Sequence, residues 1–454
     1  MTTAALAERR LPPGPRPRHL LGVLPWIRRD SLGFLRENFA RYGDVTGYRL
    51  GPLRSALIVH PDGVRHVLQE HVKNYTKDHA SYTMVRWIAG DGLLTNQGES
   101  WLRQRRLAQP AFHRQRVSAM GEMMVRHSEG VLDEWEEAAT AGQPVDVGAA
   151  MARLALRIVG DALFGARVDT QAETIGRSFT TLSEQLVLRF RTGNVLPPVL
   201  PTRRDREWRR ALAALDALIY AMIAERRRGG EDRGDLFSMF LLARDEETGA
   251  SMSDKHLRDE LLTMLFAGHE TTATALTWTW ALLDANPAAA ARLHAELDTV
   301  LGERSPTVAD LPRLAYTRMV IDEALRLYPP AWIMARGVKD NDSIGGYAIP
   351  KGSAVDISPY MTHRHPAFWP DPERFDPERF TPEQQAARHK YAYIPFSTGP
   401  RICIGNTFAL MEATLALATI ARRVRLRLTG PLPEPEPLIT LRPRGGLQML
   451  TERR

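Results

Sequence analysis

Apolar residues recur at three- and four-residue spacing along most of the chain, which is the period of an amphipathic helix. The helical stretches that this spacing predicts are residues 103–135, 147–163, 208–228, 253–286, 316–328 and 406–423. Two segments alternate apolar and polar positions instead, which is the period of a strand. Residues 44–61 predict two strands around Gly51 and Pro52, and residues 345–360 predict a second strand pair. The pattern indicates a mainly α protein with a small β region.

No linker or internal repeat divides the chain, so we predict a single domain over residues 1–454, with residues 1–20 as a flexible, proline-rich N-terminus. A length of 454 residues, 44% of them hydrophobic, is enough to bury a large core.

One predicted helix is unusually long. Ser253 and Asp254 can cap its start, and Asn286 followed by Pro287 ends it. Residues 254–285 would extend roughly 48 Å at about 1.5 Å per residue. Near the centre, "AGHETT" at 267–272 combines a glycine with two threonines, which lower helix propensity or compete for backbone hydrogen bonds. We expect a local bulge there that opens room for water or a ligand.

The net charge of the chain limits the classes of partner that are expected. The chain has 60 Lys and Arg against 53 Asp and Glu, a net charge of +7. Solvated helix faces account for most basic clusters, and an acidic protein partner is the alternative. Nucleic acid is disfavoured because no zinc finger, helix-turn-helix or RNA-recognition pattern accompanies the charge.

The sequence predicts a cytoplasmic protein without a membrane span. The N-terminal residues lack the apolar run of a signal peptide, and the most apolar long segment, 261–283, carries His269 and Glu270. Cys403 is the only cysteine, which excludes an intrachain disulfide and an all-thiolate metal cluster and favours a reducing compartment.

Cys403 lies in "FSTGPRICIG", residues 396–405, just before a predicted helix. Free amides and the positive dipole end at a helix start stabilise a thiolate. Gly399 and Gly405 let the backbone approach the sulfur closely. A lone cysteine is nevertheless often an inert buried side chain, so both interpretations are open at this point.

The spacing F-x-x-G-x-R-x-C-x-G in this stretch resembles the haem-ligand signature of the cytochrome P450 haem-thiolate monooxygenases. The resemblance implies the P450 fold, with haem b between the long central helix and the cysteine loop. It makes Cys403 the axial thiolate, and therefore the metal ligand. Phe396 would pack near the sulfur, while Gly405 and Ala409 would let the haem approach.

Two further landmarks occur in the order typical of the family. In "EALR", Glu323 and Arg326 resemble the family's E-x-x-R pair, and Arg379 of "FDPERF" would complete a buried structural triad, with Arg374 as the alternative. The propionate-binding residues that the resemblance implies are Trp101 and Arg105 of "WLRQR", together with Arg336 and Arg401.

The "AGHETT" segment resembles the family's oxygen-activation stretch, which makes Glu270 and Thr271 the catalytic pair for proton delivery. The alternative is a threonine that only bonds its own helix backbone. A zinc-protease motif is excluded because position 273 is an alanine.

The reaction implied is insertion of one atom of O2 into a lipophilic molecule such as a fatty acid, terpenoid or polyketide. "AGHETT" and the C-terminal residues look more like the fatty-acid hydroxylase branch than the camphor-hydroxylase branch. The substrate-lining residues that the resemblance suggests are Arg86, Phe266, Ala267, Ile333, Met334, Ile439 and Thr440. Arg86 could anchor a carboxylate.

No G-x-G-x-x-G dinucleotide-binding stretch follows a predicted strand, so electrons are expected from a separate ferredoxin or flavodoxin with its NAD(P)H-dependent reductase. Arg103, Arg106 and Arg114 are candidates for the docking site, and we expect a monomer. The rival functions are a peroxide-driven or isomerising haem-thiolate enzyme and a haem sensor without turnover.

Overall fold

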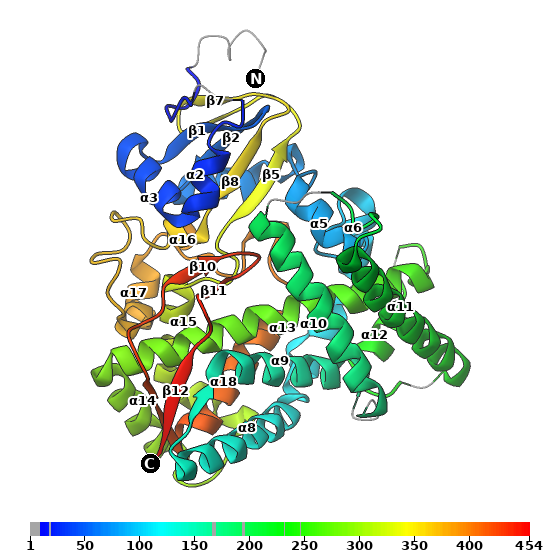
Figure 1. Cartoon of the computed structure of the whole chain (residues 1–454), viewed down its shortest axis with the longest axis vertical. Coiled ribbons are helices and arrows are strands. Elements are labelled where there is room, and N and C mark those ends of the chain that lie inside the picture. The colour runs from blue at the N-terminus through cyan, green and yellow to red at the C-terminus, as the bar shows by residue number, and fades with distance from the viewer. Residues whose placement is uncertain (1–9, 18–19, 166–168, 193–195, 231, 246) are drawn as a thin grey trace. The chain divides into compact units, whose positions relative to one another are not determined.

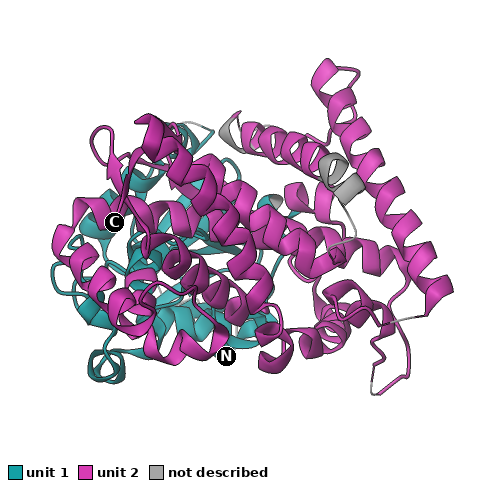
Figure 2. Cartoon of the chain, turned by 90° about the horizontal axis from the view of Figure 1, so that it is seen from below, with its two compact units in different colours: residues 1–82, 322–403 teal, residues 83–321, 404–454 magenta. Residues whose placement is uncertain are grey.

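The computed structural model describes residues 10–17, 20–165, 169–192, 196–230, 232–245 and 247–454 (Figure 1). These residues form two compact units, each made of two separate stretches of chain (Figure 2). Unit 1 comprises residues 1–82 and 322–403, and unit 2 comprises residues 83–321 and 404–454. A single functional domain over residues 1–454 stays a prediction.

The N-terminal prediction falls partly on residues 1–9 and 18–19, which lie outside the described residues. Within residues 10–17, the carbonyl of Pro13 accepts a hydrogen bond of 2.8 Å from the amide of Gly47. This part of the N-terminal segment is therefore tied to the first strand.

Unit 1 is built around a five-stranded sheet in the order β1 (Val45–Leu50), β2 (Leu53–Ile58), β8 (Ala354–Ile357), β5 (Met334–Val338), β3 (Tyr75–Thr76). A separate hairpin joins β6 (Asp342–Ile344) to β7 (Tyr347–Ile349). The helices and helical turns of unit 1 are α2 (Leu24–Arg29), α3 (Ser31–Tyr42), α4 (Pro61–Arg65), η1 (His66–Glu70), η2 (Val72–Asn74), α16 (Pro359–Thr362), η6 (Pro377–Phe380), α17 (Pro382–Ala387), η7 (Lys390–Ala392) and η8 (Gly399–Arg401).

The strand predictions are confirmed in part. β1 and β2 form the hairpin expected around Gly51 and Pro52. Residues 345–360 do contain two strands, but these strands do not pair with each other: β7 pairs with β6, whereas β8 lies between β2 and β5. All four residues of β8 are buried, and a strand in that position needs a neighbour on each side.

Unit 2 is mainly helical. Its helices are α6 (Gly98–Ala108), η3 (Gln109–Phe112), α7 (Arg114–Ser118), α8 (Gly121–Ala141), α9 (Val147–Phe164), α10 (Asp169–Thr192), α11 (Arg203–Gly229), α12 (Leu236–Leu242), α13 (Asp254–Ala285), α14 (Pro287–Val300), η5 (Val308–Arg313) and α18 (Asn406–Ala421). Two further helices, α5 (Ala80–Ala89) and α15 (Ala315–Leu327), cross the boundary between the units. The helix expected over 103–135 is interrupted after Ala108, because Pro110 cannot continue the backbone ladder.

The long helix is confirmed as α13, which runs over 32 residues. The hydroxyl of Ser253 caps its start by accepting a hydrogen bond of 3.2 Å from the amide of His256. α13 packs along α9 and also contacts α18 (Figure 1). Every residue from 272 to 283 is buried, as expected for a helix with neighbours on all sides.

The expected bulge at 267–272 is wrong, because α13 is continuous there. The hydroxyl of Thr271 donates to the carbonyl of Ala267 at 2.7 Å, so it adds to the helical bonding instead of replacing it. Gly268 permits close packing, since a Cβ at this position would lie 3.0 Å from Cγ2 of Val159.

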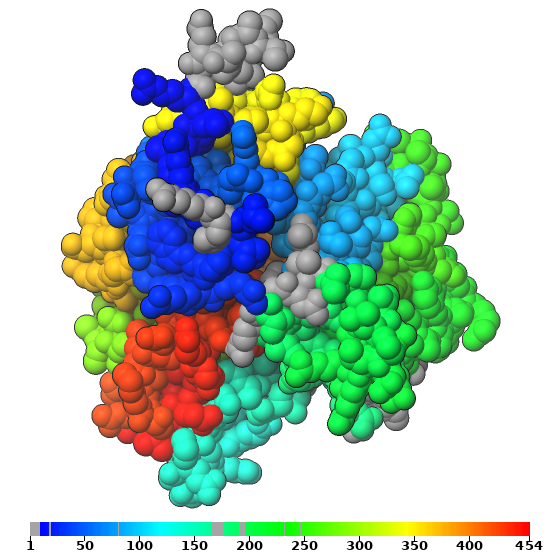
Figure 3. Space-filling view, turned by 45° about the horizontal axis from the view of Figure 1, so that its top comes forward, coloured from blue at the N-terminus to red at the C-terminus, as the bar shows by residue number. Residues whose placement is uncertain are grey.

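The C-terminal residues complete unit 2. β12 (Gln448–Arg453) pairs with β9 (Val424–Leu428) and with β4 (Pro144–Asp146), and β10 (Pro435–Pro437) pairs with β11 (Leu441–Pro443). Figure 3 shows the red C-terminal segment beside the cyan end of α8, in agreement with the contacts between α8 and β12. Among the described residues, no helix is long and apolar enough to cross a bilayer.

Candidate active site

The cysteine loop, residues 396–403 of unit 1, holds the exposed Cys403 in a turn fixed by backbone hydrogen bonds. The amide of Cys403 donates to the carbonyl of Phe396 at 2.9 Å, and the amide of Ile402 donates to the carbonyl of Gly399 at 3.0 Å. Cys403 as a whole is exposed rather than packed into a core. An inert buried cysteine is therefore not what the structure contains.

Two residues of this loop have left-handed backbone conformations. Gly399 has a φ of 72°, and a Cβ there would lie 2.0 Å from the carbonyl oxygen of Leu68. Ser397 has a φ of 60°, which is uncommon for a residue other than glycine, asparagine or aspartate. Strained backbone of this kind persists where the surrounding structure enforces it and is concentrated at functional sites.

Unit 1 also groups three basic residues, of which Lys77 and Arg336 are buried and Arg401 is half-buried. Burial lowers the pKa of Lys77 well below its ordinary value, and the charges of Arg336 and Arg401 act in the same direction. Arg336 lies on β5 and donates to the hydroxyl of Tyr82 at 2.6 Å. Because these like charges disfavour a charged Lys77, an anionic ligand such as a carboxylate would relieve the repulsion and restore the charge of Lys77.

The triad predicted for unit 1 is brought together. Arg326 binds Glu323 through two hydrogen bonds, Nε to Oε2 at 2.6 Å and Nη2 to Oε1 at 2.7 Å, and both side chains are 0% exposed. Arg379 lies with its Nε 3.5 Å from Oε1 of Glu323. The alternative residue, Arg374, directs its side chain to Asp376 instead.

The guanidinium of Arg326 is fully hydrogen bonded. Besides Glu323, its N–H groups donate to the carbonyls of His363, Pro372 and Arg374 at 3.1, 2.6 and 3.0 Å. Because these carbonyls lie in the chain that leads to the cysteine loop, the pair ties that chain to α15.

Unit 2 contributes the centre of α13. Residues 267–271 keep accessible surface, although the residues on both sides of them in α13 are buried. The hydroxyl of Thr440 donates to Oε1 of Glu270 at 2.8 Å. Burial raises the pKa of Glu270, while the hydrogen bond from Thr440 and the charge of Arg442 lower it. A carboxyl group that is accessible yet surrounded by protein can take up and release protons.

The start of α18 leaves space around Gly405, the last position of the F-x-x-G-x-R-x-C-x-G signature. Gly405 has an ordinary φ of −89°, and the nearest described atom to a Cβ at this position is Cε1 of Phe112 at 3.9 Å. The protein itself therefore does not require glycine at 405. Ala409, one turn into α18, is half-buried. Both positions suit the close approach of a flat cofactor.

The propionate candidates Trp101 and Arg105 lie one turn apart on α6, and both are half-buried. Of the predicted lining residues, Phe266 is buried, whereas Ala267, Ile333, Met334 and Ile439 keep some accessible surface. Thr440 is buried and bound to Glu270, so it is better placed to orient the carboxyl than to contact a substrate. The roles of Trp101 and Arg105 in binding propionates, and of the other residues in lining the substrate site, stay predictions.

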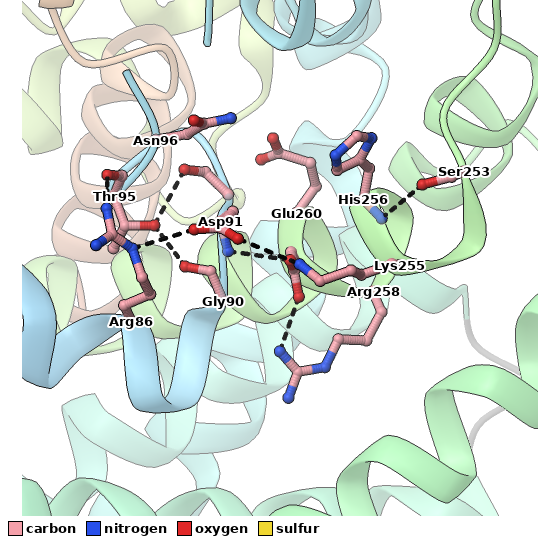
Figure 4. Close-up of polar contacts among 12 residues, drawn as sticks. Arg86, Gly90, Asp91, Thr95, Asn96, Ser253, Lys255, His256, Arg258 and Glu260 are labelled. Atoms are coloured by element: carbon pink, nitrogen blue, oxygen red, sulfur yellow. Dashed lines mark hydrogen bonds and ion pairs between the residues drawn. The ribbon is translucent and has the colours of Figure 1, made fainter. Parts of the chain in front are cut away.

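Arg86 is engaged in unit 2 (Figure 4). Its Nη2 donates to the carbonyl of Thr95 at 2.8 Å, and its Nε lies 3.1 Å from Oδ1 of Asp91. The amide of Asp91 in turn donates to Asp259 at 3.0 Å. The guanidinium of Arg86, predicted as a possible anchor for a carboxylate, thus already has an acidic partner in Asp91.

Three ionisable residues of these units with shifted pKa values were not predicted from the sequence. Lys77 belongs to no motif, and only the fold places it beside two arginines. Glu260 accepts from the amide of Leu93 at 3.1 Å, and burial raises its pKa to about 8. Glu412 of α18 is buried, which raises its pKa well above the ordinary value, while a hydrogen bond from Thr272 of α13 acts the other way.

A model of the cytochrome P450 family matches residues 12–450. The chain belongs to this family. This P450 is 41% identical over 438 residues to the cyclooctatin synthase of Streptomyces melanosporofaciens, covering 96% of this chain and 94% of that protein. It is 38% identical over 409 residues to the cyclooctat-9-en-7-ol 5-monooxygenase of the same organism, covering 90% and 88% of the two chains.

Pentalenene oxygenase of Streptomyces avermitilis is 34% identical over 401 residues, or 88% of each chain. A crystal structure of the cytochrome P450DA haem domain superposes with a TM-score of 0.88 and 29% identity over 98% of both chains. The protein is therefore a P450 monooxygenase with a cysteine-ligated haem, and its fold is the P450 fold. It requires a substrate, O2 and a redox partner.

The residues present fit the cofactor. The exposed Cys403 lies in a turn held by backbone hydrogen bonds, the cation cluster of Lys77, Arg336 and Arg401 suits carboxylates, and Gly405 leaves space beside the start of α18. These features agree with a dianionic porphyrin bound through one thiolate.

Proposed function

We propose that this P450 oxygenates a cyclic terpenoid alkene or alkenol. The similarity to a cyclooctat-9-en-7-ol monooxygenase over most of both chains carries the proposal, and the similarity to a pentalenene oxygenase supports it. The apolar character of Phe266, Ile333 and Ile439 suits such a molecule.

Arg86 favours a terpenoid over a fatty acid. A fatty acid would need a cation for its carboxylate, but the guanidinium of Arg86 is paired with Asp91. Recruiting Arg86 would break this ion pair and leave Asp91 without that partner. A neutral alkene or alkenol can bind without recruiting Arg86.

We assign Cys403 as the thiolate ligand and Lys77, Arg336, Arg401, Trp101 and Arg105 as the propionate-binding residues. A bound haem would supply the activation of O2, so that one oxygen atom enters the substrate and the other leaves as water, with two electrons from the redox partner and two protons. Cys403 would hold the iron as a thiolate, and the free amides at the start of α18 favour that form. The cations offset the propionate charges, and the Glu323–Arg326–Arg379 triad fixes the chain before the cysteine loop.

Glu270 and Thr271 supply protons in this proposal. The carboxyl of Glu270 is oriented by Thr440, and burial raises its pKa and so favours the protonated form that can release a proton. The hydroxyl of Thr271 donates to the carbonyl of Ala267 in the structure, and it must rotate away before it can donate to a water molecule. This rotation costs one hydrogen bond, on the order of 1 kcal/mol.

A ferredoxin or flavodoxin with its reductase is the proposed electron source. Arg103 and Arg114 are exposed and can meet an acidic carrier. Arg106 is less suitable because Asp245 and Glu247 already pair with it, at 3.0 and 2.8 Å. A single domain, a monomeric state and a cytoplasmic location complete the proposal.

The proposal is tested on the ferric holoenzyme with cyclic terpene alkenes and alkenols, and with fatty acids of similar size, each followed by its shift of the haem absorbance. We expect saturable shifts and oxygenated products with the terpenes alone. Shifts and products restricted to fatty acids would contradict the substrate class. Cys403→Ser should remove the thiolate signature from the reduced carbon monoxide complex, and its retention would reject Cys403 as the ligand.

A further inference from the structure

A histidine pair in unit 1 lies at a helical turn of unusual geometry. The amide of His71 donates to the carbonyl of His66 at 2.9 Å, five residues back, so η1 is a π-helical turn. In an α-helix, residues five positions apart point about 140° away from each other. The wider turn removes this separation, and the two imidazole rings stack with centroids 3.9 Å apart.

Glu70 completes a group of three possible ligands. One ligand atom from each of His66, Glu70 and His71 lies within 4.8 Å of the other two. Glu70 and His71 are exposed, and His66 is half-buried. Arg65 lies 3.1 Å from the carboxylate of Glu70, but both of these side chains are more than 40% exposed, so this ion pair is weak enough for a metal to displace.

A half-buried acidic partner, Asp342, orients His66. Its Nε2 lies 2.9 Å from Oδ2 of Asp342, which also accepts from the hydroxyl of Tyr75 at 2.6 Å. The carboxylate can only accept, so Nε2 of His66 carries the proton and Nδ1 keeps its lone pair. A carboxylate that fixes the tautomer of a histidine is the usual outer shell of a metal-binding imidazole.

We propose that His66, Glu70 and His71 bind a zinc ion, with water in the fourth position and Asp342 as the outer-shell partner of His66. Two imidazoles with one carboxylate are a known zinc donor set, and imidazole disfavours magnesium and calcium. The stacked rings cannot both point at one ion, because the ion must lie in the plane of each ring. Binding therefore turns the exposed His71 ring out of the stack.

The turn also touches the cysteine loop. A Cβ at Gly399 would lie 2.0 Å from the carbonyl of Leu68 and 3.1 Å from Oε1 of Gln69, both within η1. Zinc that clamps η1 at both ends restrains the surface against which this loop rests. The rate of haem loss from the holoenzyme should therefore fall when zinc is bound.

Calorimetric titration of tag-free holoenzyme with zinc chloride tests the site. We expect one zinc per chain, and His71→Ala should weaken binding by more than about 100-fold, because losing a ligand costs more than the ~10–100-fold typical of an outer-shell partner. Asp342→Asn should weaken binding by about 10–100-fold although Asp342 does not touch the metal. His113→Ala, which removes an exposed histidine of unit 2, is the matched control and should change nothing.

X-ray absorption at the zinc edge identifies the ligands independently. Two imidazole nitrogens and oxygen ligands at about 2.0–2.2 Å support the site, whereas a sulfur at about 2.3 Å places the zinc on Cys403 and overturns it. Absence of zinc binding, or unchanged affinity in His71→Ala, also overturns the proposal. Because His71 is exposed, this variant is expected to fold normally.

Discussion

Replacing Gly399 with alanine should disable the cysteine loop through two separate effects. An alanine at a φ of 72° costs about 1–2 kcal/mol, because its Cβ crowds the following carbonyl. Its Cβ would also lie 2.0 Å from the carbonyl oxygen of Leu68, so η1 and the loop must move apart. Forced overpacking of this kind costs about 1–3 kcal/mol. We expect a total destabilisation of about 2–5 kcal/mol.

Gly352→Ala separates the two effects. Gly352 also lies in unit 1 with a φ of 76°, but no described atom lies within 4 Å of its Cβ position. This control should show only the backbone penalty of about 1–2 kcal/mol. The difference between the two variants then measures the clash with Leu68.

The assay follows urea unfolding by the haem absorbance and by far-ultraviolet circular dichroism. Only the transition that loses the thiolate signal is compared, because a chain of this length is not expected to unfold in one step. Gly399→Ala should also lower the fraction of reduced protein that forms the thiolate-type carbon monoxide complex. Equal unfolding midpoints for Gly399→Ala and Gly352→Ala, with the full thiolate signal in both, would refute the close approach of residue 399 to Leu68.

Three further substitutions test the buried charges. Glu323→Gln leaves the Arg326 guanidinium buried without its counterion and should destabilise the protein by about 3–5 kcal/mol, read as a lower unfolding midpoint; a neutral effect would contradict the triad. Burial raises the pKa of Glu260 to about 8, so between pH 5 and 8 this carboxyl is protonated in the folded state and ionised in the unfolded state, and stability falls as pH rises. Glu260→Gln should remove this pH dependence of stability and stabilise the protein by roughly 3 kcal/mol at pH 7. An unchanged pH dependence in the variant would refute the raised pKa. Lys77→Met should accelerate haem loss at least about tenfold, since charge-assisted hydrogen bonds contribute ~1.5–3 kcal/mol, whereas the exposed Lys73→Met should not.

The elements with strong local signals could be predicted from the sequence. α13 begins and ends where Ser253, Asn286 and Pro287 indicate, and the hairpin of β1 and β2 follows from its turn and its alternation. These features depend on near neighbours in the chain. The signature around Cys403 is equally local, because all its fixed positions fall within ten residues.

Features that depend on distant residues could not be predicted. Residues 345–360 carry the pattern of a hairpin, but the burial of β8 requires β2 and β5, which lie far away in the sequence. Lys77 acquires its meaning only when the fold places it beside Arg336 and Arg401. The bulge expected near Thr271 fails for a different reason, since a threonine hydroxyl can bond to the helix backbone without breaking the ladder.

The pairing of β2 with β8 sets a problem for the nascent chain. Ser55 donates a hydrogen bond to Asp356, 301 positions later, so the first hairpin leaves the ribosome long before its central partner exists. At ~5–20 residues per second this delay lasts about 15–60 s, and a lone hairpin is marginally stable in water. During this delay the unpaired apolar edge of β2 can pair with other chains. We therefore expect more active enzyme when chaperones that hold unfolded chains are abundant and when expression is slow and at low temperature.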